Sequence, residues 1–300
     1  MAKNNKKNLA QLLDPGFMAK LDTLDVLSKK ILHGKMQGQR KSKRRGQSVE
    51  FADHRPYVVG DDLRFVDWNI YARLEQLFLK LFLEEQDLTV HIAVDISASM
   101  DYGDPSKAKF AMKLAAALAY VSLVNNNRLT LSSFNLGVVN QLKYMRGRRY
   151  LPNIAEFLLG AECEGMTDFD NACKQLAASQ AGSGIMIIIS DFFFKEGYES
   201  ALKRLIGRQY DLYAIQVLSP QEFEPEMAGD LKLIDIEDDD VAEVTISNAL
   251  LKYYKKNLSA YCNDLKEFCL KRGSSYVPAR SSDSVELLVL NYLRRVRLLK

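Results

Sequence analysis

Hydrophobic and polar positions follow two alternating patterns between residues 88 and 219. Short apolar runs bounded by turn residues predict buried strands, and apolar residues every three or four positions predict helices. The expected strands are 88–95, 128–135, 138–145, 185–191 and 211–218, and the expected helices are 106–125, 151–159, 168–180 and 197–209. The first of these helices is expected to take its N-cap from Asp104 and its first-turn proline from Pro105. This alternation is typical of an α/β fold with a mostly parallel sheet and helices on both faces.

The N-terminal part of the chain has a different pattern. A helix start at Asp14 is followed by helical apolar spacing, which predicts a helix over 17–32. Residues 29–45 carry eight Lys or Arg and no Asp or Glu, and with three nearby glycines they predict a flexible basic loop. We therefore predict an N-terminal region of residues 1–86, separate from the domain that follows.

The last third of the chain begins with an acidic segment. Nine Asp or Glu and one Lys lie from Glu222 to Asp240, and the apolar alternation there predicts a small hairpin inserted at about 221–246. The remaining expected elements are a long helix over 247–272, a short strand over 274–278 and a final helix over 283–299, capped by Ser282 or Asp283. We assign residues 87–300 to one α/β domain that contains the hairpin.

Composition excludes several classes of protein. The chain has 300 residues, 47% of them hydrophobic, which is enough for a sizeable core. No apolar run reaches the ~18 residues that cross a bilayer, so we expect no transmembrane segment and a cytoplasmic location. The four cysteines form no Cys-x-x-Cys pair and are expected to be buried free thiols. A net charge of +3 does not by itself indicate a polyanion partner.

Three polar side chains directly follow the first expected strand of the domain. They are Asp95, Ser97 and Ser99, so one carboxylate and two hydroxyls are spaced two residues apart. Ligands of open α/β sheets bind outside the carboxyl ends of the strands. A loop with this spacing can turn all three oxygens toward one point, and oxygen ligands are what a hard cation such as Mg²⁺ requires. The motif therefore predicts a cation site.

Two further residues fit the same site. Thr167 precedes the helix expected at 168–180, and Asp191 ends an almost wholly apolar strand. If these strands are parallel neighbours, both residues lie at the same sheet edge as Asp95. The predicted metal-binding set is therefore Asp95, Ser97, Ser99, Thr167 and Asp191.

Catalytic motifs are missing from the sequence. There is no Gly-x-Ser-x-Gly elbow and no phosphate-binding Gly-x-x-x-x-Gly-Lys loop. A phosphatase that starts at a strand-end Asp needs a second Asp where this chain has Ser97. His91 lies inside a strand and is expected to be a core residue with its hydrogen bonds satisfied. We expect a binding protein and no enzyme.

A metal-dependent hydrolase stays open as an alternative. Its general base would come from the acids nearest the predicted site, which are Asp101, Asp104 and Asp168. A nucleic-acid or anionic-surface binder acting through Arg40–Arg45 is a third hypothesis. That stretch lacks interleaved aromatic residues, so no nucleic-acid partner is expected. A charged cluster in the N-terminal region is interpreted as a salt-bridged loop that docks this region onto the sheet, and a functional surface is the alternative. Its residues are His54, Arg55, Asp61, Asp62, Arg64, Asp67 and Arg73.

The set Asp-x-Ser-x-Ser, then Gly-x-Thr, then an apolar strand ending in Asp resembles the metal-ion-dependent adhesion site of von Willebrand factor A domains. The resemblance implies a Rossmann-like fold in which Ser97, Ser99 and Thr167 bind the cation directly. Asp95 and Asp191 would then act mainly through water. The usual third motif is Thr-Asp-Gly, whereas this chain has Ser-Asp-Phe at 190–192, so the loop after Asp191 is expected to be shaped differently.

A narrower signature precedes the predicted domain. It resembles the bacterial family named for domain of unknown function 58, in the stretches 48–57 (SVEFADHRPY), 60–64 (GDDLR), 67–68 (DW) and 72–73 (AR). The resemblance implies an adaptor that works with a MoxR-type AAA+ ATPase on a client protein. The expected cofactor is Mg²⁺, or alternatively Mn²⁺ or Ca²⁺. An acidic side chain of the partner would complete the coordination of the cation.

Overall fold

The computed structural model describes residues 9–26, 50–83, 88–178, 184–208, 210–225, 229–234, 236–237 and 241–300. The chain forms two compact units. One unit is Gly34–Asp87, and the other combines Met1–His33 with Leu88–Lys300. Each is described by itself below, and the domain boundary predicted at residues 86/87 stays a prediction.

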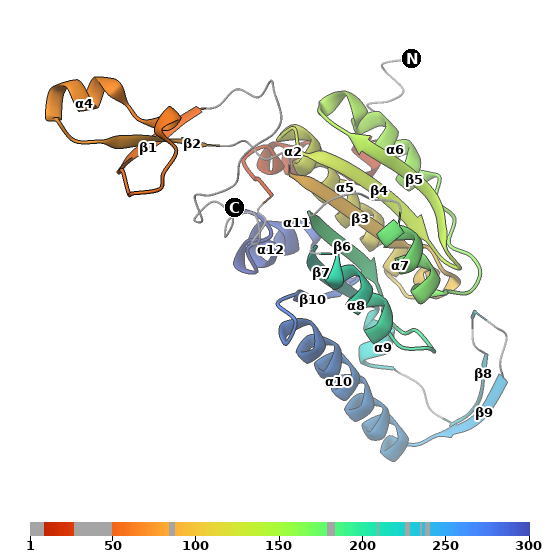
Figure 1. The fold of residues 1–300 in the computed structure, drawn as a ribbon. Coiled ribbons are helices and arrows are strands. Elements are labelled where there is room, and N and C mark those ends of the chain that lie inside the picture. The colour runs from red at the N-terminus through yellow and green to blue at the C-terminus, as the bar shows by residue number, and fades with distance from the viewer. Residues whose placement is uncertain are drawn as a thin grey trace. The chain divides into compact units, whose positions relative to one another are not determined.

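A six-stranded sheet forms the centre of the larger unit. Its strands are β3 (Thr89–Asp95), β4 (Arg128–Phe134), β5 (Val138–Met145), β6 (Ile185–Ser190), β7 (Asp211–Leu218) and β10 (Ser275–Arg280), in the spatial order β10-β7-β6-β3-β4-β5 (Figure 1). All neighbouring pairs are parallel except β4 and β5. The predicted α/β class with a mostly parallel sheet is confirmed. A parallel strand is covered on both faces, and every residue of β6 is buried.

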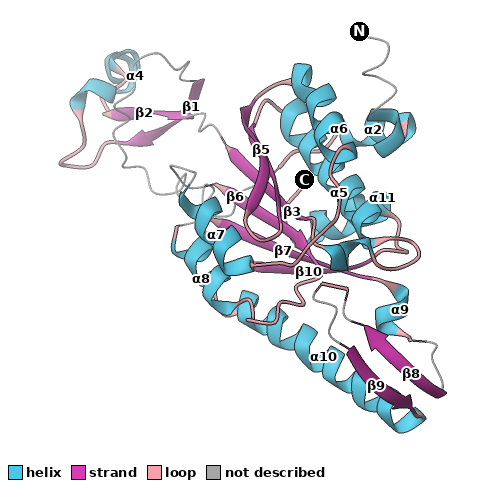
Figure 2. Cartoon of the chain, turned by 90° about the vertical axis from the view of Figure 1, so that its right-hand side faces the viewer, coloured by secondary structure: helices cyan, strands magenta, loops and turns pink. Residues whose placement is uncertain are grey.

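Helices cover both faces of this sheet (Figure 2). On one face, α5 (Lys107–Val124) and α6 (Leu151–Leu159) share a buried apolar cluster with the side chains of Ile92 and Val94. On the other face, α7 (Phe169–Ala178), α8 (Glu199–Gly207) and α10 (Asn248–Leu270) pack against a cluster that includes Ala93. Successive strand residues point to opposite faces, so β3 contributes to both clusters.

The N-terminal helix is shorter than predicted. Helix α2 (Pro15–Leu21) begins at its cap Asp14, as expected, but ends at Leu21. Thr23 Oγ1 donates to the carbonyl of Lys20 (2.8 Å), and Asp25 Oδ1 accepts from the next backbone N–H (2.8 Å). Such local side-chain bonds compete with helical ones. The helix predicted over 17–32 was therefore wrong over residues 22–26, and residues 27–32 lie outside the described part.

Two helix starts also differ from the prediction. Helix α5 is capped by Ser106, whose hydroxyl accepts from the N–H of Lys109, so the cap expected at Asp104 was wrong. The C-terminal helix is capped by Ser284, because Asp283 instead accepts from the backbone of Arg280. It divides into α11 (Val285–Leu287), the π-helical η4 (Leu288–Tyr292) and α12 (Leu293–Arg295).

The acidic segment contains a hairpin. After α9 (Pro220–Phe223), whose Ser219 and Glu222 form a capping box, strands β8 (Gly229–Ile234) and β9 (Val241–Ile246) pair antiparallel. Ile236 and Glu237 are the described residues of their connection. The hairpin predicted at about 221–246 therefore has a structural counterpart over 229–246.

The smaller unit is a two-stranded antiparallel sheet with a helical excursion. Strands β1 (Glu50–Pro56) and β2 (Phe78–Leu83) flank the short η1 (Leu63–Phe65) and helix α4 (Trp68–Leu74). The predicted basic loop at residues 29–45 lies outside the described residues. In the described part of the chain, no helix is long and apolar enough to cross a membrane. The expected cytoplasmic location stays a prediction.

Candidate cation site

The end of β3 carries a buried carboxylate in a fixed position. Asp95 is fully buried, and its Oδ1 accepts the backbone N–H of Ser97 (3.0 Å). Its Oδ2 accepts the hydroxyl of Ser190 (2.7 Å), which ends the parallel neighbour strand β6. Both carboxylate oxygens are therefore held from two adjacent strands, as the parallel pairing predicts.

The two serine hydroxyls after Asp95 lie close together. Ser97 Oγ and Ser99 Oγ are 3.0 Å apart, where the chain enters the short helix η2 (Ala98–Asp101). Two neighbouring oxygens on an octahedral Mg²⁺ with bonds of about 2.1 Å are separated by about 3.0 Å. The spacing of the hydroxyls therefore fits two adjacent ligands of such a cation.

Backbone pairing brings the loop of Thr167 to the same edge. The N–H of Glu164 donates to the carbonyl of Ile96, and the N–H of Ala98 donates to the carbonyl of Gly165, both at 3.0 Å. Gly165 has a φ of 75°, a conformation that favours glycine. Two loops that are distant in sequence are thus joined as if they were strands, and Thr167 lies beside the Asp95–Ser99 loop.

Asp191 follows β6 and forms a buried ion pair that the sequence did not reveal. Its Oδ2 accepts Lys107 Nζ at 2.7 Å, and Lys107 Nζ also donates to Glu222 Oε1 at 2.6 Å. Lys107 is buried on the first turn of α5. Burial lowers its pKa, but the charges of Asp191 and Glu222 outweigh this and raise the pKa above its ordinary value.

Asp95 lacks such a compensating cation. Among the described residues, no Lys, Arg or His lies within ion-pair distance of its carboxylate. Burial, and then the negative charge of Asp191, raise the pKa of Asp95 to about 7. The edge therefore combines three hydroxyls with one paired and one unpaired carboxylate.

This set of oxygens fits a hard divalent cation. No cluster of three or more His, Cys, Asp and Glu side chains suited to a metal occurs in the described ranges. Hydroxyl groups would supply most of the ligands of a cation at this edge, and the 3.0 Å spacing of Ser97 and Ser99 is compatible with this. The residues that would hold the cation are those predicted from the sequence.

The loop after Asp191 compensates for its missing glycine. Phe192 stands at the glycine position of the adhesion-site motif and adopts a φ of 60°, in the left-handed region that glycine favours. Its buried ring contacts Phe169 and Phe194, and Tyr261 Oη donates to its carbonyl at 2.5 Å. Aromatic packing holds the conformation, although a non-glycine residue there costs about 1–2 kcal/mol.

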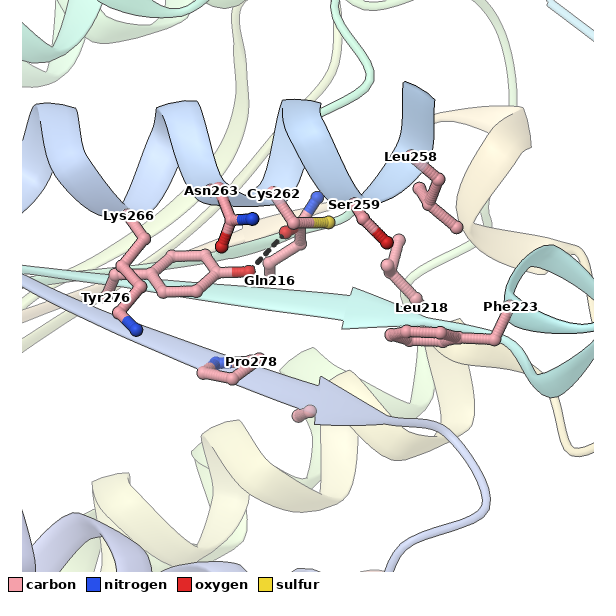
Figure 3. Close-up of a pocket in the computed structure, with 11 residues that line it drawn as sticks. Gln216, Leu218, Phe223, Leu258, Ser259, Cys262, Asn263, Lys266, Tyr276 and Pro278 are labelled. Atoms are coloured by element: carbon pink, nitrogen blue, oxygen red, sulfur yellow. Dashed lines mark hydrogen bonds between the residues drawn. The ribbon is translucent and has the colours of Figure 1, made fainter. Parts of the chain in front are cut away.

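A second support reaches this loop from the space between α10 and the sheet. Gln216 Nε2 donates to the carbonyl of Asp191 at 2.8 Å, and Tyr276 Oη donates to Gln216 Oε1 at 2.7 Å (Figure 3). Both side chains line a cavity of about 280 Å³ together with Cys262. Asp191 is thus anchored from its backbone side, and its carboxylate faces Lys107.

The charged cluster of the smaller unit forms ion pairs within that unit. Asp61 receives two bonds from Arg55, at 2.7 and 2.8 Å. Asp67 caps α4 and lies 3.0 Å from His54 Nε2. The hydrogen bond with His54 is the main cause that lowers the pKa of Asp67 to about 2. The ion pairs predicted for this loop are confirmed, whereas its docking onto the sheet stays a prediction.

The acids named for the hydrolase alternative are either exposed or hydrogen-bonded to the backbone. Asp168 Oδ1 accepts the N–H of Asn171 at 2.8 Å in the first turn of α7. Asp101 and Asp104 are exposed. His91 is buried as expected, but its Nδ1 has no hydrogen-bond partner among the described residues, so the expectation of satisfied hydrogen bonds was wrong there. Burial lowers its pKa to about 4.

A family model described as "Protein of unknown function DUF58" matches residues 53–261. The chain belongs to the DUF58 family. The match spans the charged cluster of the smaller unit and all five residues of the candidate cation site. The family assignment predicted from the signature before residue 88 is confirmed.

Curated relatives of this DUF58 protein are known from mycobacteria. "Uncharacterized protein Rv1480" of Mycobacterium tuberculosis (strain ATCC 25618 / H37Rv) is 28% identical over 257 residues, or 84% of this chain and 81% of the relative. "Uncharacterized protein Mb1516" of Mycobacterium bovis (strain ATCC BAA-935 / AF2122/97) gives the same values.

Solved structures with a similar arrangement include the conserved hypothetical protein BatB from Bacteroides thetaiotaomicron, which is 16% identical with a TM-score of 0.44 and covers 69% of this chain and 98% of its own. An aerotolerance-related membrane protein from Bacteroides fragilis NCTC 9343 is 17% identical with a TM-score of 0.45, over 69% of this chain and 99% of its own.

Proposed function

We propose that this DUF58 protein is a metal-dependent protein-interaction module with a von Willebrand factor A-type adhesion site. The observation that carries the proposal is the 3.0 Å spacing of Ser97 Oγ and Ser99 Oγ beside the buried, unpaired carboxylate of Asp95. Such an arrangement is costly without a cation, because a buried carboxylate without a counter-charge is destabilised. A bound divalent cation supplies the missing positive charge.

The residues of the proposed site have different roles in binding, and each role follows from the chemistry of the side chain. Ser97, Ser99 and Thr167 offer neutral oxygens, so a cation on them keeps much of its charge. Asp95 and Asp191 are held by hydrogen bonds, and the family resemblance implies that they would act on the cation mainly through water. Lys107 already neutralises Asp191, which reduces the negative charge at the edge further. The cation therefore stays attractive to an Asp or Glu of a protein partner.

The partner and the cation follow from the family resemblance. We propose Mg²⁺ as the physiological ion, with Mn²⁺ and Ca²⁺ as alternatives. The proposed partners are a MoxR-type AAA+ ATPase and a client protein whose complex the pair matures or remodels. In this role the chain binds and positions its partners and performs no catalytic step itself.

Calorimetric titration of the chelator-treated full chain with Mg²⁺, Mn²⁺ and Ca²⁺ tests the proposal. We expect one site in the wild type, and a loss of affinity of at least about 100-fold in Ser97→Ala/Ser99→Ala, because loss of even a supporting partner of a metal ligand costs roughly 10–100-fold. Ser200→Ala, which removes an exposed hydroxyl on α8, is the matched control. Equal binding by the double variant and the wild type would refute the proposed site.

A further inference from the structure

A carboxylate from the hairpin reaches the candidate cation site. Glu237 lies between β8 and β9, 70 residues from Thr167 in the sequence. Its Oε2 accepts the backbone N–H of Thr167 and its Oε1 accepts the Thr167 hydroxyl, each at 3.4 Å. These distances are long for hydrogen bonds. The contacts therefore bring Glu237 to the rim of the site without fastening it tightly.

The sheet edge that Glu237 reaches already contains two other carboxylates. They belong to Asp95 and Asp191, and the buried ammonium group of Lys107 is engaged by Asp191 and Glu222. Glu237 brings a third carboxylate to this edge. A divalent cation held there attracts all three carboxylates, and this attraction is stronger near a buried edge than in water.

The geometry agrees with direct binding to such a cation. Adjacent ligands of an octahedral Mg²⁺ are about 3.0 Å apart, and Glu237 Oε1 lies 3.4 Å from Thr167 Oγ1. A hydroxyl has one donor and two lone pairs. If Thr167 donates its proton to Glu237, its lone pairs stay available for the cation. The two oxygens can therefore be neighbouring ligands after a shift of a few tenths of an ångström.

We infer that Glu237 is an internal acidic ligand of the cation site and occupies the coordination position that a partner's Asp or Glu takes. The inference rests on the proposed function, because it requires the cation held by Ser97, Ser99 and Thr167. A tethered ligand acts at an effective concentration in the millimolar range. A partner must therefore displace the hairpin carboxylate before its own acid can reach the cation.

Mn²⁺ binding to the full chain, followed by water proton relaxation, tests this inference. Bound Mn²⁺ relaxes water in proportion to the number of water molecules it carries, so loss of a protein ligand raises the relaxation per bound ion. We expect Glu237→Gln to bind Mn²⁺ roughly 10-fold more weakly, at the lower end of losses around metal sites, and to show higher relaxation per bound ion. Glu224→Gln, an exposed acid of the same segment, is the matched control and should resemble the wild type.

Sodium acetate then probes the vacated position. In Glu237→Gln, acetate should replace the additional water and return the relaxation toward the wild-type value, whereas sodium chloride at equal ionic strength should not. The wild type should respond little to acetate, because Glu237 already holds the position. Thermal unfolding of the metal-free proteins confirms that the variants are folded.

The outcomes separate the two hypotheses. If the wild type binds Mn²⁺ and Ser97→Ala/Ser99→Ala does not, the proposed cation site holds. If Glu237→Gln then shows the affinity and relaxation of the wild type, Glu237 is no ligand and the inference is overturned alone. If the wild type binds no Mn²⁺, the proposed function is overturned together with the inference.

Discussion

Two regions of this DUF58 protein carry Asp-containing motifs, and they differ in whether each carboxylate has a charged partner. In the smaller unit, Asp61 is paired with Arg55, and Asp67 is paired with His54 and Lys80. At the carboxyl edge of the six-stranded sheet, Asp95 is fully buried and is bonded only to neutral groups, as far as the described residues show. The first region neutralises these carboxylates internally, whereas the second neutralises Asp191 through Lys107 but leaves Asp95 without a charged partner among the described residues.

This difference shows which motif is the better candidate for a binding site. When charged residues neutralise one another, their contribution to the local structure is enough to account for them. A buried carboxylate beside converging hydroxyls has a cost that the fold itself does not offset, and this cost is typical of functional sites. We therefore propose the sheet edge as the binding site, and the following predictions test that proposal.

Removal of the buried ammonium group of Lys107 at the edge should have the largest effect. Lys107→Met leaves Asp191 and Glu222 without their shared ammonium group, so Asp191 becomes as uncompensated as Asp95. We expect the free energy of unfolding to fall by about 3–5 kcal/mol, as for other broken buried ion pairs. Urea unfolding measures the change.

The control for this experiment is Lys109→Met, which replaces an exposed lysine on the same turn of α5. Its effect should stay within about 0.5 kcal/mol, as is usual at the surface. If both variants lost the same free energy of unfolding, Lys107 would contribute no more than an exposed lysine. Asp191 would then be no better compensated than Asp95.

His91 tests whether burial alone, without a binding role, produces a large electrostatic cost. Its pKa is lowered from 6.5 to about 4 by burial, so the native state excludes a proton that the unfolded chain binds. Stability should therefore be complete above pH 6.5 and fall as the pH drops to about 4, by roughly 3 kcal/mol in total. His91→Phe should remove this part of the pH dependence in urea unfolding measured between pH 7 and 4.

A wild-type curve no steeper than that of His91→Phe would contradict the prediction. The imidazole ring lies edge-on to Tyr210, at a centroid distance of 5.4 Å, so phenylalanine can retain the aromatic contact. The comparison then isolates the titration from the loss of packing.

Neutralising Asp95 should move stability and cation binding in opposite directions. Asp95→Asn removes an uncompensated buried charge but keeps an oxygen for the N–H of Ser97. We expect the metal-free protein to gain on the order of 2 kcal/mol in the free energy of unfolding, while cation affinity falls in the same titrations. Asp101→Asn, at an exposed carboxylate of η2, should change neither property strongly. A loss of stability in Asp95→Asn would show that the carboxylate serves packing.

Substitutions in the smaller unit should have the smallest effect on cation binding. Asp61→Asn and Asp67→Asn break ion pairs within that unit, and neither residue belongs to the proposed ligand set. Their cation affinities should equal that of the wild type in calorimetric titration. A marked loss in either variant would mean that the charged cluster contributes to the site, and the contrast between the two regions would fail.

Much of the fold could be predicted from local patterns. Helix α6 and strand β7 have the predicted bounds, because strong apolar periodicity is a local property. The predicted helix over 17–32 failed because Thr23 and Asp25 bond to nearby backbone groups. The cap of α5 was misplaced because Asp104 and Ser106 are both suitable residues and only the folded backbone selects one.

The candidate site likewise contains residues that could be predicted from the sequence and residues that could not. The motif from Asp95 to Ser99, with Thr167 and Asp191, could be recognised in the sequence because residues at strand ends have predictable positions once the alternation of elements is known. Lys107, Glu222 and Glu237 could not be found in this way. The first is one of several lysines in a helix, and the other two belong to a long acidic segment.

Local patterns in the sequence were enough to predict the class of the fold, the order of its strands along the chain and the five oxygen-bearing side chains at strand and loop ends. The three-dimensional structure was needed to show that β3 lies beside β6, that a lysine neutralises Asp191 but not Asp95, and that a hairpin carboxylate contacts Thr167. The two kinds of feature differ in how far along the chain the interacting groups lie from each other. Periodicity and capping depend on neighbours within about one helical turn, whereas the charge balance of a buried site depends on groups that only folding brings together.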